Sequence, residues 1–250
     1  MCLFKQEEIE RRLEQSAGKI AGESHPLKIL FSPTSLNHYS IDRFSDIYSQ
    51  VEEGDFDTVV IVESQPGTHE KKLPMPSHKT FTTRFGDVKV NEQLRNELCD
   101  EDDDFFIDDE AFSKDLSLFD QLLFLQNRLE DFSVLSIQIT DESPAIIKEL
   151  SAALEEILAS RKALLVFCCD IHHLKPAVLD KVMKQFEDEN RSGLINTIKS
   201  ADISMNGAGS FLAGLLIAEK WKTKLTLTQN DPSAGPVSAY ANVQFQPIPG

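Results

Sequence analysis

Basic residues and long apolar runs are both scarce in this chain of 250 residues. Lysine and arginine together number 25 against 41 acidic residues, and the net charge of −16 leaves no basic stripe for nucleic acid or for an anionic membrane surface. The longest apolar run, residues 163–169, is far shorter than the roughly 20 residues that a membrane-spanning helix needs. The composition therefore argues against nucleic-acid and membrane partners, and such acidity is usual in soluble proteins.

Cysteine is also rare, with four residues at positions 2, 99, 168 and 169. Cys168 and Cys169 are adjacent in an apolar run, and neighbouring side chains on a strand point to opposite faces, so no disulfide is expected between them. The lack of a disulfide framework favours a reducing compartment. Residues 1–16 are charged and lack the continuous apolar stretch of a signal peptide. We therefore expect a cytoplasmic protein.

Two familiar enzyme motifs are missing. No Gly-x-Ser-x-Gly elbow is present, which disfavours a serine hydrolase. Gly207 and Gly209 precede an apolar segment, but Leu212 stands where a dinucleotide-binding loop needs its third glycine. Free backbone amides at this point could receive an anion. Close packing of a glycine-rich helix start is the favoured interpretation.

Apolar periodicity predicts strands and helices that alternate along the chain. Residues 58–62 are β-branched and residues 163–169 are continuously apolar, which is typical of buried parallel strands. Residues 63–78 are rich in proline and lack a period, so they are expected to form a loop. Helices are expected at Gln6–Ala17, at 41–53 after an N-cap at Ser40, and at 91–98, 113–125, 144–158, 175–187, 191–200 and 211–221, with further strands at 28–31, 80–85, 88–90, 132–139, 224–228 and 237–245.

This alternation predicts one layered α/β domain over residues 1–250, with residues 1–24 as a peripheral N-terminal helical segment. Its central sheet is expected to be mostly parallel or mixed, flanked by helices, with an antiparallel edge near the C-terminus. In open sheets of this kind, ligands lie outside the carboxyl ends of the strands. Four segments are candidates by that rule: 33–34, 63–69, 170–173 and 206–209.

An acidic run at residues 100–104 invites a calcium interpretation, because alternate positions are aspartates as in an EF-hand loop. The sixth position of that loop would be Phe105, where glycine is needed. The twelfth would be Ala111, where a bidentate glutamate is needed. A solvated loop is the favoured interpretation.

The strand ends also resemble motifs of the Memo family, the middle partner of the AmmeMemoRadiSam proteins, over about Ile29 to Phe245. The order and spacing of the segments carry this resemblance, since each motif alone is degenerate. The family's fold is similar to that of the class III extradiol dioxygenases. Where the family has Pro-His-Ala-Gly, Gly-Pro-x-His-His, Ser-Ser-Asp-x-Ser-His and Ala-Cys-Gly-x-x-Pro, this chain has PTSL at 33–36, ESQPG at 63–67, CCDIHH at 168–173 and MNGAGS at 205–210.

The resemblance implies a metal centre of two imidazoles and a thiolate or carboxylate. The matching positions here hold Thr34, Pro66 or Gly67, and Asn206, which are poor ligands or none for a transition metal. Acidic and imidazole helper residues are likewise replaced by apolar side chains. We therefore expect no metal and a vestigial pocket, formed by Thr34, Pro66, Gly67, His69, Leu116, Phe119, Asn206 and Gly207.

Two residues of the family's site survive, Asp170 and His173. As an acid–base pair at a strand end they could transfer a proton, and they are the catalytic residues if the protein is active. The favoured alternative is a relic pair in which Asp170 closes a helix start.

These observations favour a non-catalytic protein that has no cofactor and uses the old cleft for an unidentified small ligand or protein partner. The alternative is a metal-dependent oxidoreductase of the dioxygenase-like class, with iron, copper or zinc at a site rebuilt around His69, Asp170 and His173. A structural subunit of a larger complex is a third possibility.

Overall fold

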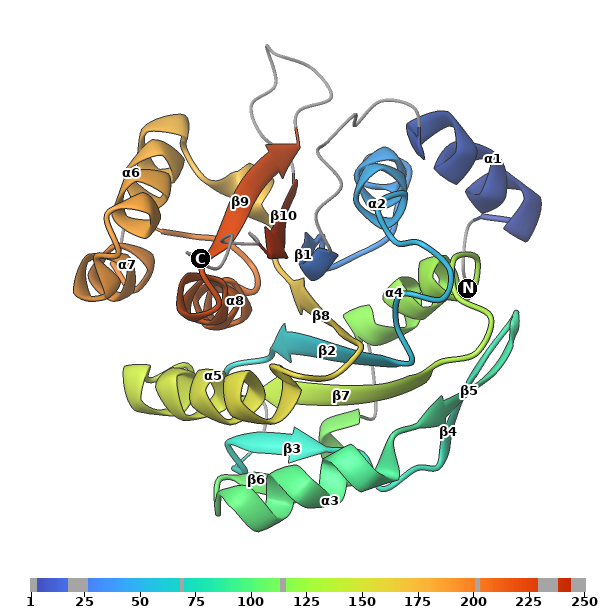
Figure 1. Ribbon diagram of the computed structural model, residues 1–250, viewed down its shortest axis with the longest axis horizontal. Helices are drawn as coiled ribbons and strands as arrows, with labels where there is room; N and C mark the ends of the chain where they lie inside the picture. Colours follow the sequence, from blue (N-terminus) through green and yellow to red (C-terminus); the bar gives the residue numbers. More distant parts are fainter. Residues whose placement is uncertain are drawn as a thin grey trace, which may run out of the picture.

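A computed structural model describes residues 4–17, 27–67, 70–112, 116–200, 203–228 and 238–243 (Figure 1). Its centre is an eight-stranded sheet in the order β4-β5-β7-β2-β8-β1-β10-β9. The five inner strands β5, β7, β2, β8 and β1 are parallel to one another, while β4 and β10 pair antiparallel with their inner neighbours. The strand bounds are β1 Leu27–Ser32, β2 Thr58–Ser64, β4 Thr80–Thr83, β5 Gly86–Val90, β7 Ser133–Ile139, β8 Ala163–Cys168, β9 Thr223–Thr228 and β10 Ser238–Val243.

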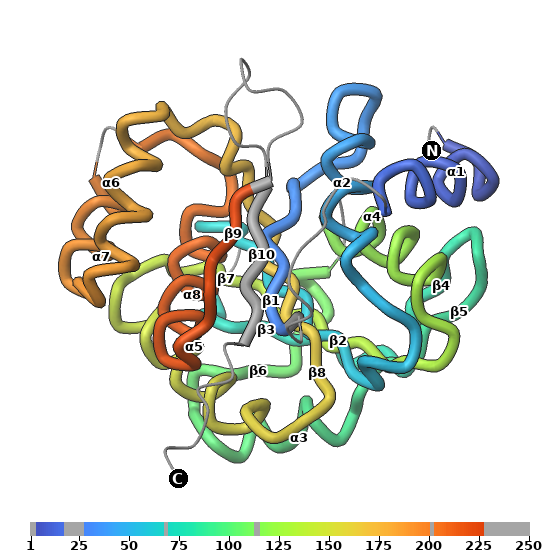
Figure 2. The backbone as a smooth tube through the Cα atoms, turned by 45° about the horizontal axis from the view of Figure 1, so that its top comes forward, coloured from blue at the N-terminus to red at the C-terminus, as the bar shows by residue number. Residues whose placement is uncertain are grey.

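The predicted α/β fold is confirmed, including the antiparallel edge near the C-terminus. At that edge β10 pairs antiparallel with both β1 and β9. Figure 2 shows β1 and β9 running along this edge. A second antiparallel edge, β4, closes the opposite side. Because β2 and β8 lie in the middle of the sheet, both of their faces are covered, which is why their sequences are almost entirely apolar.

Two layers of helices cover the sheet, and alternate residues of each strand face one layer or the other. On the right of Figure 1, α2 and α4 pack on the strand face that carries Leu30, Val59 and Val166, and α1 packs against α2. On the left, α5 to α8 cover the opposite face, which carries Ile29, Val60 and others. The helix bounds are α1 Gln6–Ala17, α2 Ile41–Tyr48, α3 Glu92–Glu101, α4 Ser117–Leu125, α5 Pro144–Leu158, α6 Pro176–Glu187, α7 Arg191–Ile198 and α8 Ala208–Lys220, with short 3₁₀ turns η1 Asp109–Phe112 and η2 Ile171–His173.

Four local expectations are wrong. Residues 63–78 are not all loop, because Leu73–Met75 form β3, which pairs with β6 (Phe105–Ile107) in a small parallel sheet. The proline inside β3 masked the strand signal. The Ser40 side chain does not cap α2; its hydroxyl donates to the Ser35 carbonyl at 2.6 Å, and α2 ends earlier than expected. The last helix starts at Ala208, one turn before the apolar run.

In the described part of the chain, no helix is both long enough and apolar enough to span a bilayer.

Candidate functional site

The carboxyl ends of the central parallel strands lie together along one edge of the sheet. Strand pairing aligns Ser32 of β1 with Cys168 of β8, and Cys168 in turn with Glu63 of β2. The segments that follow these strands, together with the start of α8, carry most of the predicted site residues. The edge is therefore where the general rule for open α/β sheets places a ligand.

Asp170 joins three of these segments through its carboxylate. The Thr34 N–H donates to Oδ1 at 3.0 Å and the Thr34 hydroxyl donates to Oδ2 at 2.8 Å. The Asn206 side-chain amide donates to the same Oδ2 at 2.9 Å. Asp170 is only 5% exposed, so these charge-assisted bonds replace its hydration. We call these three residues, Thr34, Asp170 and Asn206, the polar hub. The hub connects the loop after β1 to the end of β8 and to the segment before α8.

The segment before α8 lies directly against the end of β8. The Asp170 N–H donates to the Asn206 carbonyl at 3.0 Å, which brings the Asn206 side chain to the hub. Gly207 follows with φ +76°, and a Cβ there would lie 2.1 Å from the Cys168 carbonyl oxygen. Only glycine allows both this backbone conformation and this close approach.

His173 contacts Asp170 through the backbone. Its N–H donates to the Asp170 carbonyl at 3.0 Å, and its ring lies 4.1 Å from that of His172, centroid to centroid. Burial, followed by the charge of Arg43, lowers the pKa of His172 to about 4, so this imidazole is neutral at pH 7. Within the described residues, the hydrogen bonds of the Asp170 carboxylate go to the other hub residues. Proton transfer between Asp170 and His173 stays a prediction.

A cavity of about 550 Å³ opens beside the hub, between η2, the end of α7 and the start of α8. His173 and Asn206, two of the predicted site residues, line it. The other walls combine charged and apolar side chains, among them Glu142, Lys199, Ile203 and Met205. The cavity is large enough for a small molecule.

The segment after β2 is more open. Pro66 and Gly67 are exposed, and the Gly67 N–H donates to the Thr140 carbonyl at 2.9 Å. Neither residue has a side-chain donor to offer a metal. His69, which the alternative function needs, lies outside the described residues.

Leu116 and Phe119 lie on the α2 and α4 side of the sheet. Leu116 is buried just before α4, whereas Phe119 is 40% exposed and meets the ring of Phe81 edge-on at 6.0 Å. The cavity beside the hub is lined by other residues. The predicted pocket residues are therefore spread over three areas, of which only the hub side forms a compact group.

Glu63 is buried at the end of β2, at the start of the candidate segment 63–69, but it was not singled out from the sequence. Its carboxylate accepts the backbone N–H groups of Ser117 at 3.2 Å and Leu118 at 3.0 Å, at the N-terminus of α4, and the Gln65 amide at 3.0 Å. Burial raises the pKa of Glu63, and these hydrogen bonds oppose the rise. The sequence signal that could have identified Glu63 is a carboxylate at the end of a long apolar strand.

Glu63→Gln should change how stability depends on pH. The folded protein holds the Glu63 proton more tightly than the unfolded chain, whose pKa is near 4.5, so stability is lost as pH rises from that value through the folded pKa. Glutamine cannot titrate, so the wild type should lose stability relative to the variant over this window. Urea denaturation between pH 4 and pH 8 measures the difference. For the control Glu156→Gln, at an exposed position on α5, the free energy of unfolding should depend on pH as it does in the wild type. The same pH dependence in Glu63→Gln and the wild type would contradict the raised pKa of Glu63.

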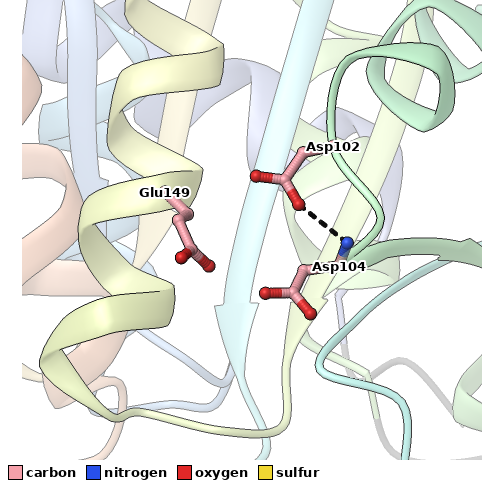
Figure 3. A group of neighbouring side chains, drawn as sticks. All are labelled: Asp102, Asp104 and Glu149. Carbon is pink, nitrogen blue, oxygen red and sulfur yellow. Dashed lines mark hydrogen bonds between the residues drawn. The ribbon is translucent and has the colours of Figure 1, made fainter.

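A separate acidic cluster joins the loop before β6 to α5 (Figure 3). One carboxylate oxygen each of Asp102, Asp104 and Glu149 lies within 4.8 Å of the other two. Sequence reasoning considered the aspartates as part of an EF-hand loop and missed Glu149, which comes from a distant helix. The Lys72 ammonium lies 2.8 Å from Asp104 and lowers the pKa of that carboxylate, while the pKa of Glu149 is raised by its hydrogen bond with Asp104. A lysine thus already supplies positive charge to the cluster.

The hub residues do not fit a transition-metal centre. A metal ligand must offer a free lone pair in fixed geometry. The Thr34 hydroxyl and the Asn206 amide instead point donor groups at Asp170. Two of the carboxylate's lone-pair directions are used by these side chains, and a third by the Thr34 backbone.

Comparisons with known proteins agree with this architecture. The family model described as Memo-like protein matches residues 4–241. A MEMO1 family protein from Metallosphaera sedula is 23% identical over 185 residues, covering 71% of this chain and 66% of the relative. Another from Sulfurisphaera tokodaii is 24% identical over 214 residues, covering 79% and 75%. The matched part thus spans about two thirds to three quarters of these relatives.

A solved structure shares the fold. The crystal structure of an uncharacterized protein from Escherichia coli K12 has a TM-score of 0.54 at 12% identity. The match covers 86% of this chain and 99% of that one.

Proposed function

We propose that this chain, which belongs to the Memo-like protein family, is a non-catalytic binding protein whose cavity beside the polar hub takes a small ligand or a partner segment. The single observation that carries the proposal is the set of bonds to the Asp170 carboxylate. Thr34 and Asn206 stand where the family resemblance assigns metal ligands, and here both donate to Asp170. Through Asp170, the hub thus connects two of the three segments that would supply metal ligands, those of Thr34 and Asn206.

The cavity supports a binding role. It has about 550 Å³ of space, polar and apolar walls, and it lies at the carboxyl edge of the sheet. His173 and Asn206 line this space, so one of the two surviving family residues, His173, would contact a bound ligand. The remaining walls come from Glu142, which precedes α5, and from the stretch between the end of α7 and the start of α8.

Metal analysis of the purified protein tests this proposal. Iron, copper and zinc are expected at well below one equivalent per chain, because Thr34, Pro66 and Asn206 supply no imidazole, thiolate or carboxylate. Addition of a chelator should leave the unfolding midpoint unchanged, since no folding free energy would come from a metal. Reloading with each metal should not raise the midpoint.

His173→Ala is the matched variant for the same measurement. One equivalent of metal in the wild type that disappears in this variant would overturn the proposal. That result would favour the metal-dependent oxidoreductase built around His69, Asp170 and His173. If the wild type and His173→Ala both contain the same metal content, well below one equivalent per chain, the result supports the proposed binding protein.

A further inference from the structure

β9 is an edge strand with one open side. It is the last strand of the eight-stranded sheet (Figure 1), and within the described residues it pairs with β10 alone. An edge strand presents a row of N–H and C=O groups that can pair with another chain. β9 offers six residues for such pairing, whereas the opposite edge strand, β4, has four. The longer open edge is therefore at β9.

Three lysines surround the start of this strand. Lys220 ends α8, Lys222 lies in the turn that follows, and Lys224 is the second residue of β9. All three are exposed, and none has a carboxylate partner in the part of the chain that the structure describes. Residues 220–228 contain no aspartate or glutamate. Although the chain has a net charge of −16, this edge is locally positive and attracts negative charge.

The two faces of β9 differ in character. Leu225 and Leu227 are partly buried on the side of α8, where they pack against the core. Because side chains alternate along a strand, Lys224 and Thr226 lie on the opposite face. A strand added beside β9 would continue both faces, with apolar side chains next to the leucines and acidic ones next to Lys224. The edge thus fits an extended segment in which acidic and apolar residues alternate.

A second copy of this chain fits the same edge less well. Another β9 would bring its own Lys224 and no aspartate or glutamate, so it would supply no opposite charge to the three lysines. Lysines on an edge strand also disfavour pairing between identical strands. The charge at β9 therefore favours an acidic partner over self-association.

We propose that β9 is a docking edge for an acidic, extended segment of a partner protein, which adds to the sheet as a further strand. In this mode of recognition, backbone hydrogen bonds supply affinity and alternate side chains supply specificity. The lysines would select the charge of the segment. None of these residues lines the cavity beside the hub, so the inference goes beyond the proposed function.

A fluorophore-labelled peptide, Glu-Val-Glu-Val-Glu-Val-Glu, tests the proposal at low salt. Fluorescence anisotropy should show saturable binding to the wild type that weakens as salt is added, because salt screens exposed charges. The peptide Glu-Glu-Val-Val-Val-Glu-Glu has the same charge and composition but no alternation, and it should bind about fivefold more weakly. Hydrogen exchange of residues 223–228 should slow in the presence of the first peptide, since their open amides become paired.

Lys222→Gln/Lys224→Gln removes two charges from the edge. This double variant should bind the alternating peptide about three- to tenfold more weakly, because exposed ion pairs contribute modestly to affinity. Lys79→Gln/Lys89→Gln is the matched control, since it removes two exposed lysines next to β4 and on β5, at the opposite edge of the sheet. The control should bind the peptide as the wild type does. Circular dichroism verifies that the compared proteins are folded.

Equal affinity for the two peptides, or equal losses in the two double variants, would reduce the effect to general charge attraction and overturn the proposal. No saturable binding to the wild type would also overturn it. Self-association of Lys222→Gln/Lys224→Gln in that case would identify the lysines as guards against self-pairing. A wild-type dimer in sedimentation that protects residues 223–228 from exchange would assign the edge to a second copy. None of these results would alter the metal analysis, so the two proposals fail independently.

Discussion

Gly207→Ala is expected to lower the free energy of unfolding by about 4 kcal/mol or more, at the upper end of what single substitutions do. Two costs add at this position. Gly207 has φ +76°, which an L-residue adopts only at a cost of about 1–2 kcal/mol. The new Cβ would also lie 2.1 Å from the Cys168 carbonyl oxygen and 2.7 Å from Cys169 Cα. Backbone atoms cannot turn aside as a flexible side chain would, so the segment before α8 must move off the strand.

Gly54→Ala provides the matched control for this experiment. Gly54 has a similar φ of +83°, but a Cβ there would meet nothing within 4 Å. This variant should cost only about 1–2 kcal/mol, the price of the backbone conformation alone. Urea denaturation followed by circular dichroism compares the two, and soluble yield serves where Gly207→Ala does not fold. Equal costs at the two positions would mean that the segment before α8 is not held against β8.

The layout of the fold was predictable because each central strand is buried on both sides. The runs at 58–62 and 163–169 have no polar face, which is the pattern of parallel strands covered by helices. Except for β3, β6 and the two 3₁₀ turns, the predicted strand–helix order matches the structure. The errors occur where the secondary-structure propensity of a residue disagrees with its burial in the folded chain. Pro74, for example, lies inside β3. Its neighbours Leu73 and Met75 are buried in the core, and the gain from burying them outweighs the low strand propensity of proline.

The candidate site was predictable only in part. Thr34, Asp170 and Asn206 follow strand ends or precede a helix, so their meeting at one edge follows from topology. The hydrogen bonds between these residues do not follow from topology, because they depend on how closely the segment at Gly207 approaches the end of β8. Glu142 was not singled out from the sequence, since nothing in its neighbours indicates that it reaches the first turn of α8. Contacts between segments far apart in sequence require the folded chain.

Asp170→Ala is expected to cost about 3 kcal/mol of stability, because it removes a buried carboxylate that accepts three hydrogen bonds. The carboxylate accepts three hydrogen bonds, two from Thr34 and one from Asn206, at 2.8 to 3.0 Å. Hydrogen bonds to a charged group contribute about 1.5–3 kcal/mol each and do not add fully when they share one acceptor. Urea denaturation measures the loss. Asp180→Ala, at an exposed position on α6, should change stability by less than about 0.5 kcal/mol.

A double-mutant cycle separates the structural role of Asp170 from a role in proton transfer. Thr34→Val should cost about 1 kcal/mol in the wild type and almost nothing in the Asp170→Ala background, because the hydroxyl then has no acceptor to lose. His173→Ala should leave stability within about 0.5 kcal/mol, since the His173 side chain is exposed and meets Asp170 only through its backbone. The opposite pattern, with strong coupling of Asp170 to His173 and none to Thr34, would mean that the aspartate orients the imidazole. Coupling to Thr34 instead identifies Asp170 as the residue that fixes the loop after β1 to the end of β8.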